Sequence, residues 1–140
     1  MNKYIFLSSK ELINIINLKL IKNGIDVTHI EIDNGIKFKG KVSNKINCKF
    51  CGSIFIKKID NNILFLESKN LEISGLGFLK LSNKFLLKSV ANIIGEDYVT
   101  TDENNIAINL DKLPIIIKDI YIESNLLYIL GENIDIYLNA

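Results

Sequence analysis

The feature that most constrains the fold of this chain is a change of hydrophobic period along its length. In the segment Ile36–Val42, apolar residues alternate with Lys37, Lys39 and Lys41, which is the pattern of a strand with one buried face. Elsewhere, apolar residues recur every three or four positions, as they do on one face of an amphipathic helix. The two periods together predict an α+β fold in which antiparallel strands pack against helices.

The first predicted helix begins at a capping box and ends at a glycine. In a capping box, the Ser8 hydroxyl and the Glu11 carboxylate each accept a hydrogen bond from a backbone amide at the helix start. We expect the helix to run to about Lys22, because Asn23-Gly24 is a typical stop signal. Its apolar stripe consists of Leu12, Ile13, Ile16 and Leu20.

A second helix is predicted from Ser82, a suitable N-cap, to a stop at Gly95. Lys84, Lys88 and Asn92 recur every four residues and define its polar side. The helix therefore has a wide apolar face to bury against a sheet. That face consists of Leu86, Leu87, Val90, Ile93 and Ile94.

Most of the remaining chain has the pattern of strands joined by short turns, which predicts an antiparallel meander. Residues 33–35 (Asp-Asn-Gly) form a strong hairpin signal, residues 51–52 (Cys-Gly) predict a bulge, and residues 131–133 (Gly-Glu-Asn) predict a hairpin turn. The polar residues 98–104 are predicted to form a mobile loop. The predicted strands are Tyr4–Leu7, Ile25–Ile32, Ile36–Val42, Ile46–Ile59, Ile63–Ile73, Ile106–Leu110, Ile115–Ile122, Leu126–Leu130 and Ile134–Leu138.

The composition is that of one domain with a large core. A chain of 140 residues, 48% of them hydrophobic, suits a single domain over residues 1–140. We find no apolar run near the roughly 20 residues of a transmembrane helix, and the apolar start at Tyr4–Leu7 is too short for a secretory signal. We therefore expect a cytoplasmic location, with release by an unconventional route as the alternative.

Charge argues against nucleic acid as a partner. The chain contains no arginine, which supplies the planar fork that reads guanine and clamps phosphate, and its net charge is only +1. The charge is unevenly spread, with 15 lysines against 7 acidic residues in residues 1–95, and 2 lysines against 9 acidic residues in residues 96–140. Either the basic half attracts an anionic partner, or basic and acidic strands face each other within the fold.

The residues that could carry chemistry are few. Cys48 and Cys51 form a lone Cys-x-x-Cys in a predicted strand, where residues three apart point to opposite faces, and His29 is the only histidine. We interpret the cysteines as reduced and half-buried and the histidine as a half-exposed strand residue. Residues 75–77 (Gly-Leu-Gly) do not complete a phosphate-binding motif, since position 80 is lysine. The sequence predicts no enzyme activity, no metal site and no cofactor.

The surplus of apolar faces leaves two interpretations open. A sheet curled around a helix could keep an apolar groove for a lipid or another apolar ligand, or side chains could fill the core completely. The candidate groove residues come from both helices and the meander. They are Leu12, Ile16, Leu20, Phe38, Phe55, Phe65, Leu86, Val90 and Ile94.

The segment Ser8–Ile16, with its Ser-x-x-Glu-Leu phrase, resembles the start of a tubular lipid-binding (TULIP) module. The order of helix, meander, second helix and closing strands is similar to bacterial LmeA-type and YceB-type proteins. It is also similar to the OrfX-type accessory proteins of neurotoxin gene clusters. The resemblance implies a highly curved antiparallel meander wrapped on the N-terminal helix, with lipid held between them.

Two departures from the TULIP pattern shape the functional hypotheses. LmeA-type proteins are exported, and larger members pair two modules, whereas this chain has no visible export signal and one module. The first hypothesis is a non-enzymatic lipid-binding protein. The second is an accessory subunit of a larger complex, such as a neurotoxin-associated complex, with a filled core and no lipid. Its partner is another protein or a second copy, and Lys37, Lys39 and Lys41 contact an acidic partner or lipid headgroups. A third is a structural domain whose function lies in another chain.

Overall fold

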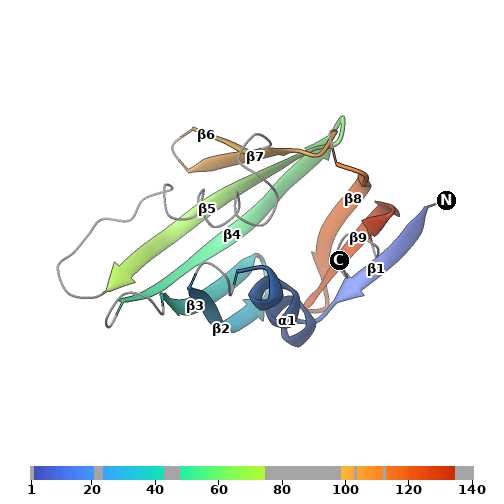
Figure 1. Ribbon diagram of the computed structural model, residues 1–140. Coiled ribbons are helices and arrows are strands. Elements are labelled where there is room, and N and C mark those ends of the chain that lie inside the picture. Colours follow the sequence, from blue (N-terminus) through green and yellow to red (C-terminus); the bar gives the residue numbers. More distant parts are fainter. Residues whose placement is uncertain are drawn as a thin grey trace.

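The computed structural model describes residues 2–20, 24–42, 48–74, 99–102, 104–111 and 113–134. In these ranges the chain forms two antiparallel sheets and a helix, which lies beside β2 (Figure 1). The predicted second helix, Ser82–Gly95, lies outside the described residues. The elements are β1 (Lys3–Leu7), α1 (Ser9–Leu20), β2 (Ile25–Ile32), β3 (Ile36–Val42), β4 (Cys48–Asp60), β5 (Ile63–Ser74), β6 (Val99–Asp102), β7 (Asn105–Asn109), β8 (Ile116–Glu123) and β9 (Leu126–Glu132).

The larger sheet contains the predicted meander. Its strand order is β2-β3-β4-β5-β7-β6, so four consecutive strands lie side by side before β7 inserts between β5 and β6. The Asp-Asn-Gly hairpin joins β2 to β3, and β4 turns into β5 at Asn61 and Asn62, both with positive φ. The predicted bulge at Cys51-Gly52 is confirmed by a register shift between Cys51 and Ser53.

The smaller sheet, ordered β1-β9-β8, joins the two ends of the chain and corrects one prediction. Gly131 was predicted in a hairpin turn, but it lies inside β9, and most of the strand predicted after it, Ile134–Leu138, lies outside the described residues. A different turn, at Ser124 and Asn125, joins β8 to β9. A Cβ on Gly131 would collide with the backbone oxygen of Ile116 on the neighbouring strand. The glycine therefore allows two strands to approach each other closely and does not form a turn.

The predicted loop at residues 98–104 was also wrong in part. Val99–Asp102 forms β6 and pairs with β7 at the edge of the larger sheet. Only Val99 is buried, whereas Thr100, Thr101 and Asp102 are exposed. A short edge strand with one apolar anchor has almost the composition of a loop, and its pairing partner decides its structure.

The capping box of α1 is confirmed. The Glu11 backbone amide donates to the Ser8 Oγ at 3.2 Å, and the Ser8 backbone amide donates to the Glu11 carboxylate at 3.1 Å. Further along the helix, the Asn17 side-chain amide accepts from the Val27 backbone N–H and donates to the Val27 carbonyl, both at 2.8 Å. Asn17 thus occupies the outer edge of β2 as another strand would.

The core consists of two apolar clusters. The first lies between α1, β2 and the smaller sheet and contains Leu12, Leu20 and Ile129; the second lies at the β5–β7–β6 end and contains Ile106. Phe38, Ile56 and Ile117 pack against both clusters and make them continuous. No helix in the described part of the chain has the length and apolarity needed to span a bilayer.

Candidate functional site

Four of the predicted groove residues come together in the core. Leu12 and Leu20 of α1 are buried, with exposed fractions of 9% and 3%. Ile16 and Phe38 are half-buried and pack against the same cluster. The apolar stripe of α1 is therefore in contact with strand side chains. Leu86, Val90 and Ile94 lie outside the described residues.

Phe55 and Phe65 lie on the other face of the larger sheet. Phe38 and Gly52 are cross-strand partners on the core face, so Phe55, three positions after Gly52, points the other way. The Lys69 Nζ lies 5.0 Å from the centre of the Phe55 ring, and the Lys58 Nζ lies 5.1 Å from that of Phe65. The structure does not bring these two rings together with Phe38.

The predicted lysine row lies on the exposed face of the larger sheet and is wider than its sequence suggests. Lys37, Lys39 and Lys41 of β3 are all exposed and share one face because they are two residues apart. The strand register then places Lys49 of β4 directly opposite Lys41, and Cys51 opposite Lys39. We call the four lysines, at positions 37, 39, 41 and 49, the lysine face. Sequence analysis did not identify Lys49 as part of this face, because its place opposite Lys41 depends on the register of β3 and β4.

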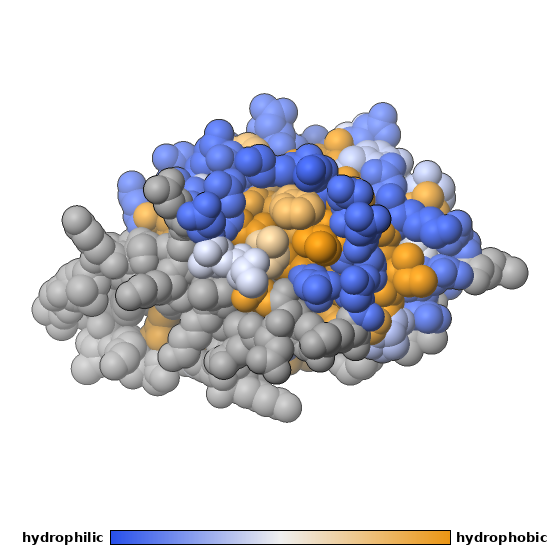
Figure 2. All heavy atoms as spheres, turned by 90° about the horizontal axis from the view of Figure 1, so that it is seen from above, coloured by the Kyte–Doolittle hydropathy of each residue, from blue (hydrophilic) through white to orange (hydrophobic). Residues whose placement is uncertain are grey.

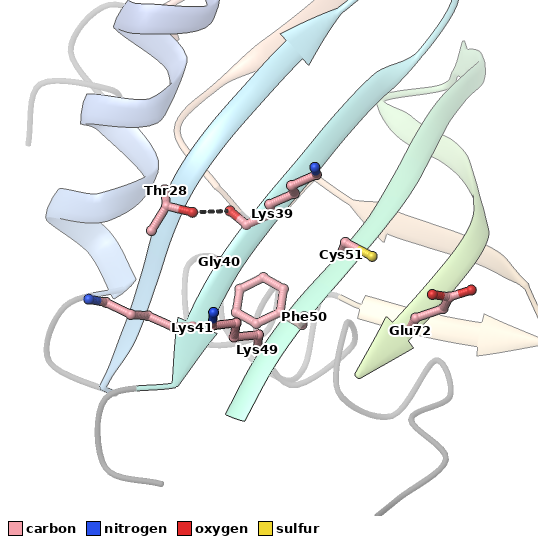
Figure 3. Close-up of a pocket in the computed structure, with 8 residues that line it drawn as sticks. All are labelled: Thr28, Lys39, Gly40, Lys41, Lys49, Phe50, Cys51 and Glu72. Carbon is pink, nitrogen blue, oxygen red and sulfur yellow. Dashed lines mark hydrogen bonds between the residues drawn. The ribbon is translucent and has the colours of Figure 1, made fainter. Parts of the chain in front are cut away.

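A shallow hollow of about 570 Å³ lies in this face (Figure 3). The Thr28 hydroxyl donates to the Lys39 carbonyl at 3.3 Å, which ties β2 to β3 along the hollow. Lys39, Cys51 and Glu72 come from three adjacent strands. The hollow is lined by Thr28, Lys39, Gly40, Lys41, Lys49, Phe50, Cys51 and Glu72.

Acidic residues border the lysine face on two sides. On β2, Asp26 and Glu31 are the register partners of Lys41 and Lys37, and the exposed His29 is the partner of Lys39. On β5, Glu72 is the partner of Cys51. The positive strip is therefore two strands wide at Cys51, where Glu72 borders it, and reaches β5 at Lys69, the partner of Ser53. The free thiol of Cys51, half-buried as predicted, lies within it.

The outer face of the smaller sheet carries a ladder of aromatic rings, which the sequence analysis did not identify. Phe6, Tyr128 and Tyr121 are cross-strand neighbours on β1, β9 and β8. The Phe6 and Tyr128 ring centres are 6.0 Å apart, and the Tyr128 and Tyr121 rings stack at 5.1 Å. Partial burial, followed by the neighbouring Tyr4 and Glu123, raises the pKa of Tyr121 above its usual value.

A hollow of about 580 Å³, with Thr100, Thr101, Asp102 and Asn105 among its polar lining residues, lies among β4, β5, β6 and β7. Its lining includes Phe65, Ile106 and Ala107, with Lys57 and Lys58 on the β4 side. Strands β6 and β7 are at the top of Figure 1. Seen from that side, the molecule has apolar surface at its centre, bordered above and to the right by hydrophilic residues (Figure 2).

In the described part of the chain, no three histidine, cysteine or acidic side chains are grouped as a metal site would require. The lysine face offers positive charge and hydrogen-bond donors, and the two hollows are open to solvent. Comparisons of the chain with protein-family models, with curated proteins and with solved structures gave no match.

Proposed function

We propose that this protein is a non-enzymatic interaction subunit that docks on an acidic surface of a partner protein through its lysine face. The observation that carries the proposal is the placement of four exposed lysines on two neighbouring, hydrogen-bonded strands. Strands hold their side chains at fixed spacing, so this charge pattern is preorganised. The arrangement supports recognition by charge more than it supports chemistry.

The dimensions of the strip define the partner further. Lys37 and Lys41 are four residues apart on one strand, a distance of roughly 13 Å at the rise of an extended chain. Asp26, Glu31 and Glu72 would repel acidic groups beyond the strip's width. A narrow acidic segment that lies along β3 and β4 is therefore favoured over a broad anionic surface.

Energetics predict that the lysine face acts mainly on the rate of association. Each exposed ion pair contributes only about 0–1 kcal/mol. Several like charges on one face nevertheless raise the local concentration of an oppositely charged partner, and this steering weakens as salt is added. We therefore expect fast, salt-dependent association.

The test uses a fluorescent oligoglutamate peptide as the acidic probe and stopped-flow mixing at several salt concentrations. The triple variant Lys37→Glu, Lys39→Glu, Lys41→Glu should associate more slowly and lose its salt dependence. For a matched comparison, the double variant Lys37→Glu, Lys41→Glu is set against Lys10→Glu, Lys118→Glu, which changes the net charge equally at exposed lysines elsewhere. Equal rates for the two double variants would contradict the proposal. Vesicles containing phosphatidylserine form a second arm, and binding to vesicles but not to peptide would point to lipid headgroups instead.

A second candidate function, the binding of an apolar ligand as in TULIP modules, is supported by the hollow beside Phe65. Its volume is within the range of small-molecule sites, and Lys57 and Lys58 could hold an anionic headgroup at its rim. Native mass spectrometry of the purified protein, with lipid extraction, tests this candidate. A mass equal to that of the bare chain, and no uptake of added fatty acid, would count against it.

A further inference from the structure

The edges of the two sheets differ in how they are protected against pairing with another chain. At β2, the Asn17 amide occupies the outer N–H and C=O of Val27. At β8, the Asn62 amide bonds Ile115 and Ile117, and the Asp119 carboxylate accepts from the Ile120 N–H. Such side chains satisfy the backbone groups that an incoming strand would otherwise use.

Strand β1 is the outer strand of the smaller sheet and lacks these features. In the part of the chain that the structure describes, no side-chain amide lies against residues 4–6 of β1. The outward side chains Tyr4 and Phe6 are 55% and 59% exposed, which is unusual for large rings. The strand contains neither proline nor an acidic residue. Among the described residues, β1 therefore combines an edge that pairs with no further strand and an apolar surface.

We propose that β1 is a self-association site, at which two copies of this chain pair antiparallel about Ile5. A twofold axis at Ile5 sets Tyr4 opposite Phe6 of the second copy, and Ile5 opposite its own equivalent. Lys3 then faces Leu7 of the second copy, so the lysines of the two β1 strands do not face each other. The two three-stranded sheets become one sheet of six strands.

The aromatic ladder favours a second copy over an unrelated segment. Within one chain, the ladder runs from Tyr121 through Tyr128 to Phe6 and ends at the open edge. In the proposed dimer the next ring is Tyr4 of the second copy, and the ladder continues through both sheets. Aromatic cross-strand pairs of this kind contribute roughly 0.2–1 kcal/mol each. Five-residue strands make a small interface, so the dimer should be weak and depend on concentration.

The site is separate from the lysine face, and the two proposals are independent. Sedimentation velocity of the whole chain, at concentrations up to the millimolar range, measures the dimer directly against the chain mass of 15.9 kDa. The variant Tyr4→Lys, Phe6→Lys should be monomeric, because positions 4 and 6 of the two copies meet and like charges repel. The variant Tyr4→Glu, Phe6→Glu should be monomeric for the same reason. An equimolar mixture of the two variants should form a heterodimer.

Two further variants show whether the effect is specific to the edge pairing. Tyr4→Lys, Phe6→Glu changes the same positions but pairs opposite charges across the axis, so it should dimerise by itself. Asn14→Lys, Leu18→Lys adds two lysines at exposed positions of α1 and should dimerise like the unmodified chain. A wild-type chain that stays monomeric throughout, or a Tyr4→Lys, Phe6→Lys variant that still dimerises, would overturn the proposal.

Discussion

At the scale of single residues, two glycines of the larger sheet lie beneath phenylalanine rings. Gly40 is the cross-strand partner of Phe50, and Gly52 is the partner of Phe38. The two rings lie 6.1 Å apart on the core face, each over the site where the opposing residue would place a side chain. Glycine is thus required at both positions, because each ring occupies the space that a larger side chain would need.

Replacement of Gly40 by alanine should destabilise the fold. The added Cβ would lie 2.5 Å from the Asp26 carbonyl oxygen and would also collide with the Phe50 ring. Overpacking of this kind costs about 1–3 kcal/mol, measurable as a lower free energy of unfolding in urea. Gly52→Ala is the milder comparison, since the nearest atoms would be 3.0–3.3 Å from its Cβ. If Gly40→Ala lowered the free energy of unfolding less than Gly52→Ala, contact with the phenylalanine ring would not explain why glycine is needed.

At the scale of elements, asparagine amides join a helix to a strand edge and one sheet to the other. The Asn17 amide links α1 to β2. Asn17 lies between Ile16 and Leu20 of the apolar stripe, and the sequence pattern gives no sign that it pairs with β2. The location of α1 at the edge of the sheet thus depends on a polar contact as well as on the burial of Leu12 and Leu20.

Asn17→Ala should lower the free energy of unfolding by about 1–3 kcal/mol, because it leaves a part-buried N–H and C=O of Val27 without their partner. Asn14→Ala is the matched control on the exposed side of the same helix. The control should be neutral or slightly stabilising, since alanine has the higher helix propensity. Urea denaturation of both variants would measure the difference, and equal free energies would show that the amide pairing contributes little.

At the scale of the whole molecule, the turn between β4 and β5 connects the two sheets. The Asn62 side chain accepts from the Ile117 N–H at 2.9 Å and donates to the Ile115 carbonyl at 3.1 Å. The two sheets also differ in charge: the larger one presents the lysine face, whereas Asp119 and Glu123 lie on the smaller one. The acidic residues that border the lysine face, Asp26, Glu31 and Glu72, belong to the basic half of the chain itself.

Asn62→Gly should reduce stability while it preserves the backbone of the turn. Asn61 and Asn62 have φ of 50° and 60°, which glycine adopts without strain. Replacing either residue by glycine therefore removes its side chain without straining the backbone. Asn61 is exposed, and Asn61→Gly should be neutral or slightly stabilising. We expect Asn62→Gly to cost about 1–3 kcal/mol and to speed amide exchange at the start of β8, measured by hydrogen exchange. Unchanged exchange in β8 would show that the sheets are joined without Asn62.

The sequence alone determined those features that depend on neighbours within a few residues. The capping box of Ser8 and Glu11 and the alternation that forms β2 and β3 act over one turn or one strand, and the structure confirms them. The candidate contact residues of β3 were found for the same reason, since residues two apart in a strand must share a face.

Tertiary structure alone decided the pairings between distant segments and which strand positions face the core. Phe55 and Phe65 lie away from Phe38 although all three are apolar strand residues, because the pairing of Phe38 with Gly52 and of Ile56 with Leu66 sets which alternate positions face the core. The pairing of β1 with β9 joins the two ends of the chain and, together with the pairing of β8 with β9, assembles the aromatic ladder. Local patterns do not encode such contacts, because their free energy comes from packing against residues that are far away in sequence.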